Sequence, residues 1–63
     1  MLTRVLMDYN ALPYSPPYSL GYIVQIEIGC LFERWKSIVI MDDPQKAVER
    51  AELLGTYIGM YVR

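Results

Sequence analysis

The sequence predicts one small α+β domain spanning residues 1–63, in which an antiparallel sheet of about three to four strands carries one C-terminal amphipathic helix on one face. Three observations lead to this prediction. Residues 20–29 alternate in the manner of a strand, the segment after Asp42-Asp43-Pro44 has helical spacing, and 63 residues are enough for one domain only.

The segment before the first prolines is the least decided part of the sheet. In residues 3–9, Val5, Met7 and Tyr9 alternate with other side chains, which favours a first strand, although a short helix is an alternative. Residues 10–19 contain three prolines, which exclude a helix and remove hydrogen-bond donors from any strand ladder. We therefore expect an extended, polyproline-like loop there.

Two further strands are expected to form a hairpin through a turn at Gly29. In residues 20–29, alternation predicts one core face and one mostly solvated face; the core face holds Tyr22, Val24, Ile26 and Ile28, and the other holds Ile23, Gln25 and Glu27. Residues 34–41 are apolar on both faces, with Trp35, Val39 and Met41 on one side and Ile38 and Ile40 on the other. Such a strand is typically covered on both sides.

The helix start is well marked. Either aspartate can cap the first free N–H groups, and Pro44 suits the first helical position. The apolar positions that follow have the spacing of a single buried stripe: Ala47, Val48, Ala51, Leu54 and Ile58.

The helix end has two solutions. In the first, the helix ends at Gly55 and residues 57–62 form a strand. In the second, which we prefer because Ile58 keeps the helical period, the helix runs to about residue 58, Gly59 ends it, and residues 60–62 are a short last strand.

Composition excludes several partners. The six basic residues are scattered and the net charge is −1, so we do not expect nucleic-acid binding. No apolar run approaches the roughly 20 residues of a membrane-spanning helix, and the N-terminal residues do not have the pattern of a signal peptide. A single cysteine, Cys30, cannot form a disulfide within the chain. We expect a cytoplasmic protein that binds no membrane.

The residue types present also argue against an enzyme. The chain has no histidine, and Cys30 therefore has no imidazole base to activate it. Asp42, Asp43 and Asp8 are conceivable hard-cation ligands, but helix capping is the preferred interpretation of the adjacent pair. We expect no catalytic residues, no metal and no cofactor.

Exposed apolar and aromatic side chains are the candidates for binding. The loop carries a PxxP spacing and two tyrosines, a known recognition pattern for aromatic grooves, although a stiff connection whose tyrosines pack on the chain's own sheet is the preferred interpretation. Leu53 and Tyr57 would be neighbours on the polar side of a long helix. The predicted interaction residues are Tyr14, Pro16, Pro17, Tyr18, Trp35, Leu53 and Tyr57.

These observations predict a protein–protein interaction domain with a regulatory, adaptor or inhibitory role that self-associates, most simply as a homodimer. Hydrophobic residues make up 54% of the chain, and one helix can cover only one face of the sheet. Pairing of two copies, face to face or edge to edge, would remove the remaining apolar surface from water. The alternative is an oligomer that binds a small molecule in a pocket between subunits lined by tyrosines and Trp35.

Overall fold

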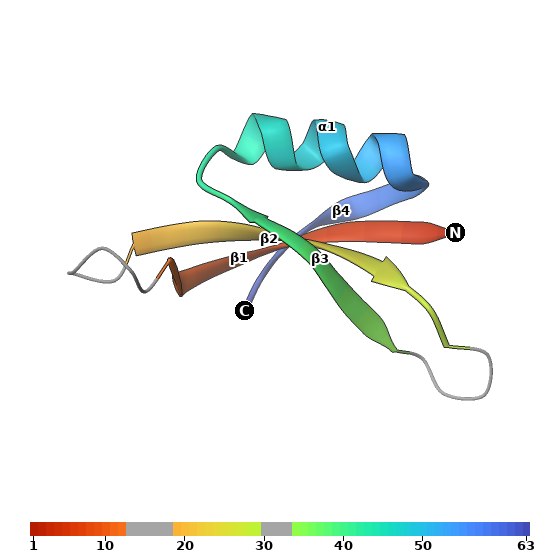
Figure 1. The fold of residues 1–63 in the computed structure, drawn as a ribbon, viewed down its shortest axis with the longest axis horizontal. Coiled ribbons are helices and arrows are strands. Elements are labelled where there is room, and N and C mark those ends of the chain that lie inside the picture. Colours follow the sequence, from red (N-terminus) through yellow and green to blue (C-terminus); the bar gives the residue numbers. More distant parts are fainter. Residues whose placement is uncertain (13–18, 30–33) are drawn as a thin grey trace.

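A computed structural model shows a four-stranded sheet with one helix packed on it, which confirms the predicted α+β class. The structure describes residues 1–12, 19–29 and 34–63. The elements are β1 (Leu2–Leu12), β2 (Ser19–Glu27), β3 (Trp35–Met41), α1 (Pro44–Leu54) and β4 (Thr56–Val62), and the strand order is β3-β2-β1-β4 (Figure 1). The sheet is mixed, because β4 joins β1 in parallel while the other pairs are antiparallel.

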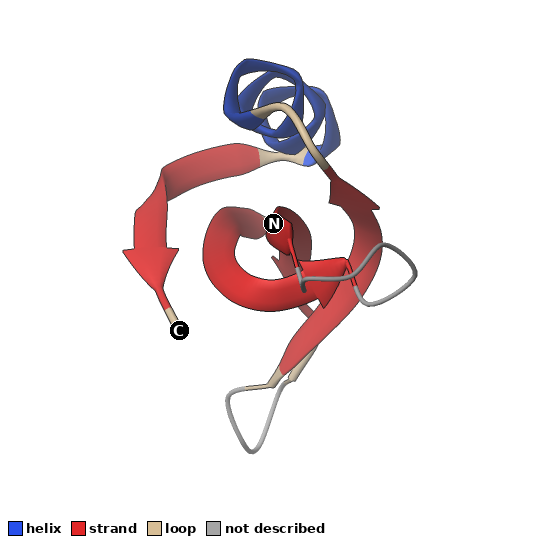
Figure 2. Cartoon of the chain, turned by 90° about the vertical axis from the view of Figure 1, so that its left-hand side faces the viewer, coloured by secondary structure: helices blue, strands red, loops and turns tan. Residues whose placement is uncertain are grey.

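The core lies between α1 and one face of the sheet. Val5 and Val24 supply the central strand residues, and Ala47 and Ala51 supply the helix residues; all four are fully buried. Small helix residues let α1 approach the strands closely, and the Thr3 hydroxyl donates a 2.9 Å hydrogen bond to the Ala51 carbonyl. Viewed along its length, the sheet curves strongly, with α1 on one side (Figure 2).

The helix begins as predicted. Asp43 is the N-cap residue, and its side chain accepts a 2.9 Å hydrogen bond from the backbone N–H of Gln45. Pro44 follows at the first helical position, where its missing N–H costs nothing.

The preferred helix end at about residue 58 is wrong, and the alternative end at Gly55 is the observed one. Leu54 is the last helical residue, and the Gly55 N–H still donates to the Ala51 carbonyl. The chain turns here because Thr56 donates a 2.8 Å hydrogen bond to the Met1 carbonyl, starting β4 beside β1. A Cβ at position 55 would collide with that same carbonyl oxygen. Ile58 therefore lies in β4 and is 42% exposed, not in the helix stripe.

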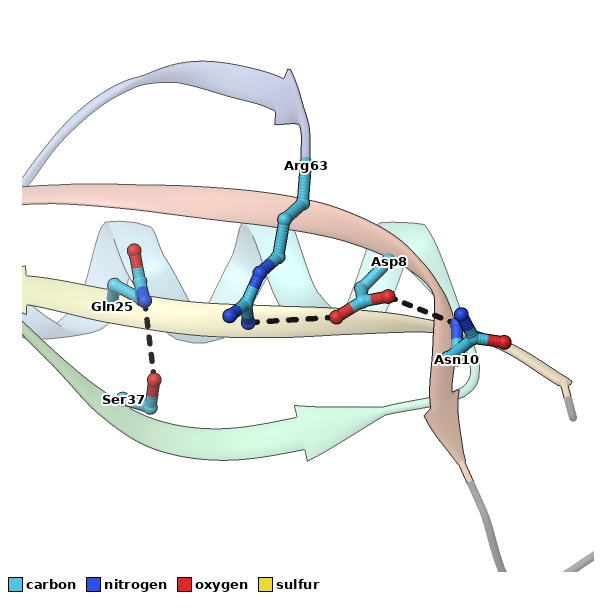
Figure 3. A network of polar contacts seen from close by, with 5 residues as sticks. All are labelled: Asp8, Asn10, Gln25, Ser37 and Arg63. Carbon is cyan, nitrogen blue, oxygen red and sulfur yellow. Dashed lines mark hydrogen bonds and ion pairs between the residues drawn. The ribbon is translucent and has the colours of Figure 1, made fainter.

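The end of β1 corrects two further expectations. Residues 10–12 belong to β1 and not to a loop, and the strand turns near Asn10 to cross the sheet face opposite α1 (Figure 3). The Ala11 and Leu12 side chains are buried there against Gly21, where an added Cβ would lie 2.6 Å from the Ala11 Cβ. The second face of β2, expected to be mostly solvated, is therefore largely covered: Ile23 is 5% and Gln25 is 7% exposed. Ile28, placed in the core by alternation, lies beyond β2 and is 55% exposed.

Both edge strands are bulged. In β3, Val39 pairs with Val24 but Ser37 pairs with Gln25, so Ile38 is an extra residue and the alternation reverses there. Trp35 therefore faces away from α1, whereas Val39 and Met41 pack on the core, which corrects the prediction that all three share a side.

The second bulge lies in β4. Thr3 pairs with Tyr57 and Val5 pairs with Met60, so β4 has one more residue than β1 between these two pairs. Gly59 lies in this bulge and has a φ of +138°. Glycine adopts this backbone conformation without steric cost. Bulges interrupt the regular row of free backbone groups along a sheet edge, which makes pairing with another strand less favourable.

No helix among the described residues is long and apolar enough to cross a membrane.

Candidate interaction surface

The sheet face turned away from α1 is the candidate surface, called the far face below. Thr3 and Val5 contact the helix, so the alternating residues of β1 point to the opposite side. Strand pairing then extends the far face across all four strands. Its members are Leu2, Arg4, Leu6, Asp8, Ile23, Gln25, Glu27, Trp35, Ser37, Ile40 and Tyr61.

A polar row crosses the middle of the far face. Arg4, Gln25 and Ser37 occupy paired positions on β1, β2 and β3. The Arg4 Nε–H donates to Gln25 Oε1 at 2.9 Å, and Gln25 Nε2–H donates to Ser37 Oγ at 3.1 Å (Figure 3 draws the second bond). Since Gln25 is almost fully buried, both of its amide ends need these partners.

Trp35 completes this row. The Arg4 guanidinium carbon lies 4.0 Å from the centroid of the Trp35 ring, well within the range of a cation–π contact. The guanidinium is thus held both by the hydrogen bond from its Nε–H to Gln25 and by its contact with the Trp35 ring. These two contacts restrict the position of the guanidinium.

An apolar row runs beside the polar one. The cross-strand pairs Leu6–Tyr61, Leu6–Ile23 and Ile23–Ile40 join four apolar side chains into a continuous line across the sheet. At the centre of the line Ile23 is buried and Leu6 is partly buried, whereas Ile40 and Tyr61 at the two ends are each 46% exposed. Ile38, the bulged residue of the neighbouring β3 segment, is 41% exposed.

The far face also carries an ion pair, between Asp8 and Arg63. Arg63 Nη1 lies 3.5 Å from Asp8 Oδ2, and Asp8 Oδ1 accepts a 2.9 Å hydrogen bond from the Asn10 N–H at the turn of β1 (Figure 3). The Arg63 side chain is largely exposed, so the pair contributes at most about 1 kcal/mol to stability. Its charges are mutually neutralised.

The predicted interaction residues do not lie together on one described surface. Tyr14, Pro16, Pro17 and Tyr18 lie outside the described residues. Trp35 is half-buried on the far face beside Arg4. Leu53 is 83% exposed on the outer side of α1.

Tyr57 and Leu53 do not form the predicted surface pair. Tyr57 lies in β4 and packs against the core cluster, because the helix ends three residues before it. Its pKa is raised above the ordinary tyrosine value, mainly by burial and further by the nearby negative charge of Glu52 and by Tyr61. The prediction that these two side chains are neighbours on one helix face is therefore wrong.

Sequence reasoning missed the polar side chains of the far face. Arg4 and Gln25 stand at alternate positions in apolar strands, where polar residues usually indicate a solvated face. The paired polar positions became recognisable only once the register joined Arg4 to Gln25 and Gln25 to Ser37.

Other sites are weaker. Within the described ranges, no three His, Cys, Asp or Glu residues cluster in a way that could hold a metal ion. A shallow depression lined by Glu49, Glu52 and Leu53 lies on α1, open to solvent. No tyrosine or tryptophan is among its described lining residues.

Comparisons of this chain with protein-family models, with curated proteins and with solved structures find no match.

Proposed function

We propose that this chain is a protein–protein interaction domain that works as a homodimer, in the cytoplasm, with an adaptor, regulatory or inhibitory role. The observation that carries the proposal is the imbalance between its core and its surface. The largest fully buried side chains of the described residues are Val5, Val24 and Thr3. Many apolar side chains of equal or larger size are exposed to water; those more than 40% exposed among the described residues are Met1, Tyr9, Ile28, Ile38, Ile40, Leu53, Ile58, Tyr61 and Val62.

Burial of apolar area stabilises a fold by about 25 cal/mol per Å². The fully buried members of the core cluster are small valines and alanines, beside the nearly buried Tyr22, and the larger side chains packed around them are only partly buried. A chain of this size also has a thin stability margin. Association would add the missing burial, because Ile38, Ile40 and Tyr61 lie on or beside the far face and would leave water together.

The far face is better suited to contact a second copy than either edge of the sheet is. Both edge strands are bulged, and β3 also carries Lys36. Bulges and edge lysines are the usual devices that prevent strand-to-strand pairing. The proposal is therefore a dimer formed face to face.

Sedimentation equilibrium at roughly micromolar concentration tests the proposal. The wild-type chain should sediment as a dimer, and Ile40→Glu should shift it towards monomer because a charge would enter the apolar contact. Leu53→Glu is the matched control, because Leu53 is an exposed apolar residue on the opposite side of the molecule. A folded wild-type monomer across this range would overturn the proposal.

A further inference from the structure

Two charged side chains of the far face, Arg4 and Glu27, form no ion pair with any described residue. In the part of the chain that the structure describes, the ion pair between Asp8 and Arg63 is the only one within 4.0 Å. Arg4 contacts Gln25 and Trp35 but no carboxylate, and Glu27 contacts no cation among the described residues. Both side chains are half-buried, which makes an unmatched charge more costly than at an exposed position.

The two charges are opposite in sign and close in the strand pattern. Arg4 pairs with Gln25 in the register, and Glu27 is the next far-face residue of β2 and pairs with Trp35. The Arg4 guanidinium reaches across to the Trp35 ring, yet it stays out of ion-pair distance from Glu27. One face therefore displays an ordered cation and a carboxylate side by side.

A closed two-fold dimer brings the same surface of both copies together, so a contact from residue i to residue j is repeated from j to i. We propose that the second copy is the occupant of the far face and that Arg4 of each copy pairs with Glu27 of the other. This inference rests on the proposed function. It adds that the Arg4–Glu27 pairs determine how the two faces are aligned. Charge complementarity supports this proposal. Two copies of the face are complementary in charge only in the orientation that places the cation of each opposite the carboxylate of the other.

The arrangement of Arg4 suits this role. Its Nε–H donates to Gln25 and its guanidinium carbon lies 4.0 Å from the centre of the Trp35 ring, while its terminal N–H groups contact no carboxylate among the described residues. Arginine binds a carboxylate through parallel N–H···O bonds, and a pre-oriented guanidinium loses little freedom on binding. Trp35, which sequence analysis placed among the interaction residues, acts here by positioning Arg4.

Charge exchange between copies tests the pairing. Arg4→Glu and Glu27→Arg should each weaken the wild-type dimer by roughly tenfold or more, because each places like charges in the contact. An equimolar mixture of the two variants should recover the heterodimer. In that mixture the carboxylate introduced at position 4 of one chain would face the guanidinium introduced at position 27 of the other, and the two unchanged residues would face each other as well. This recovery is expected only if position 4 of one chain contacts position 27 of the other chain. Glu49→Arg on the outer side of α1 is the control for charge reversal and should leave dimerisation unchanged.

Circular dichroism of each variant would establish folding before sedimentation. If Arg4→Glu does not fold, Glu27→Arg alone decides, because the Glu27 side chain makes no hydrogen bond or ion pair in the described structure. The pairing would be overturned if Glu27→Arg left the dissociation constant of the dimer unchanged, or if the mixture associated no more tightly than either variant alone. Either result would leave self-association itself standing. A wild-type chain that is monomeric would overturn both.

Discussion

Gly55 lies close to the Met1 carbonyl at the helix end. A Cβ at residue 55 would collide with the Met1 oxygen, which also accepts the first hydrogen bond of β4. Gly55→Ala should therefore lower the free energy of unfolding by about 1–3 kcal/mol, the usual cost of forcing extra volume into a packed site. Urea denaturation measures this. Lys46→Ala at an exposed helix position is the control, and equal stability of the two variants would contradict the account.

The helix cap depends on one of the two adjacent aspartates. Asp43 accepts the hydrogen bond from Gln45, so Asp43→Ala should lower the free energy of unfolding by about 1 kcal/mol. Asp42→Ala should have a much smaller effect, because Asp42 makes no such bond. Thermal denaturation compares them, and Asp43→Asn should retain most of the stability because an amide oxygen also caps. Equal losses at the two positions would be evidence against the assignment.

The raised pKa of Tyr57 predicts weaker folding in alkali. As pH rises above about 10, the unfolded chain loses the Tyr57 proton before the folded chain does. The stabilising difference is fully present below that pH and is lost as pH rises through the folded-state pKa. Stability of the wild type should therefore fall more steeply in this range than that of Tyr57→Phe. Urea titrations at a series of pH values would show this, and parallel curves would contradict it.

At the scale of elements, the sequence predicted the existence of each element better than its boundaries. The N-terminus of α1 was predictable because Asp43 and Pro44 are local signals. Its C-terminus was not, because the helical period continues to Ile58 while the helix stops at Gly55, where the Met1 backbone pairs with Thr56. That contact joins opposite ends of the chain and leaves no mark in local periodicity.

The bulges explain the remaining errors in the sheet. Alternation along residues 34–41 assumed a regular strand, but the extra residue Ile38 turned Trp35 to the other face. The coverage of Ile23 also depended on a long-range contact, because the end of β1 folds back over the sheet at Gly21. Neither event is encoded in a period-two pattern. For the same reason the polar row from Arg4 through Gln25 to Ser37 required the register before it could be recognised.

Close packing of α1 on the sheet gives a prediction at this scale. Ala51 is fully buried, so Ala51→Leu should lower the free energy of unfolding by about 1–3 kcal/mol through overpacking. Lys46→Leu introduces the same side chain on the exposed side of α1 and should have little effect. Urea denaturation of the pair distinguishes them. A stabilised Ala51→Leu chain would mean that the helix stands farther from β1 and β2 than described.

At the scale of the whole molecule, stability and association are expected to be coupled. The helix covers one face of the sheet over a core whose fully buried side chains are small. The far face holds the polar row, the apolar row and the exposed ends Ile40 and Tyr61. If a second copy covers the far face, part of the free energy of folding belongs to the dimer. Such a protein becomes more stable as its concentration rises, by mass action.

The concentration dependence of unfolding is therefore the most direct test of the central claim. The urea midpoint of the wild-type chain, followed by the fluorescence of its single tryptophan, Trp35, should rise between about 1 and 100 μM protein. Ile40→Glu should reduce that rise, because it places a charge in the proposed contact. A wild-type midpoint that is the same at both ends of this range would contradict the claim that a second copy completes the fold.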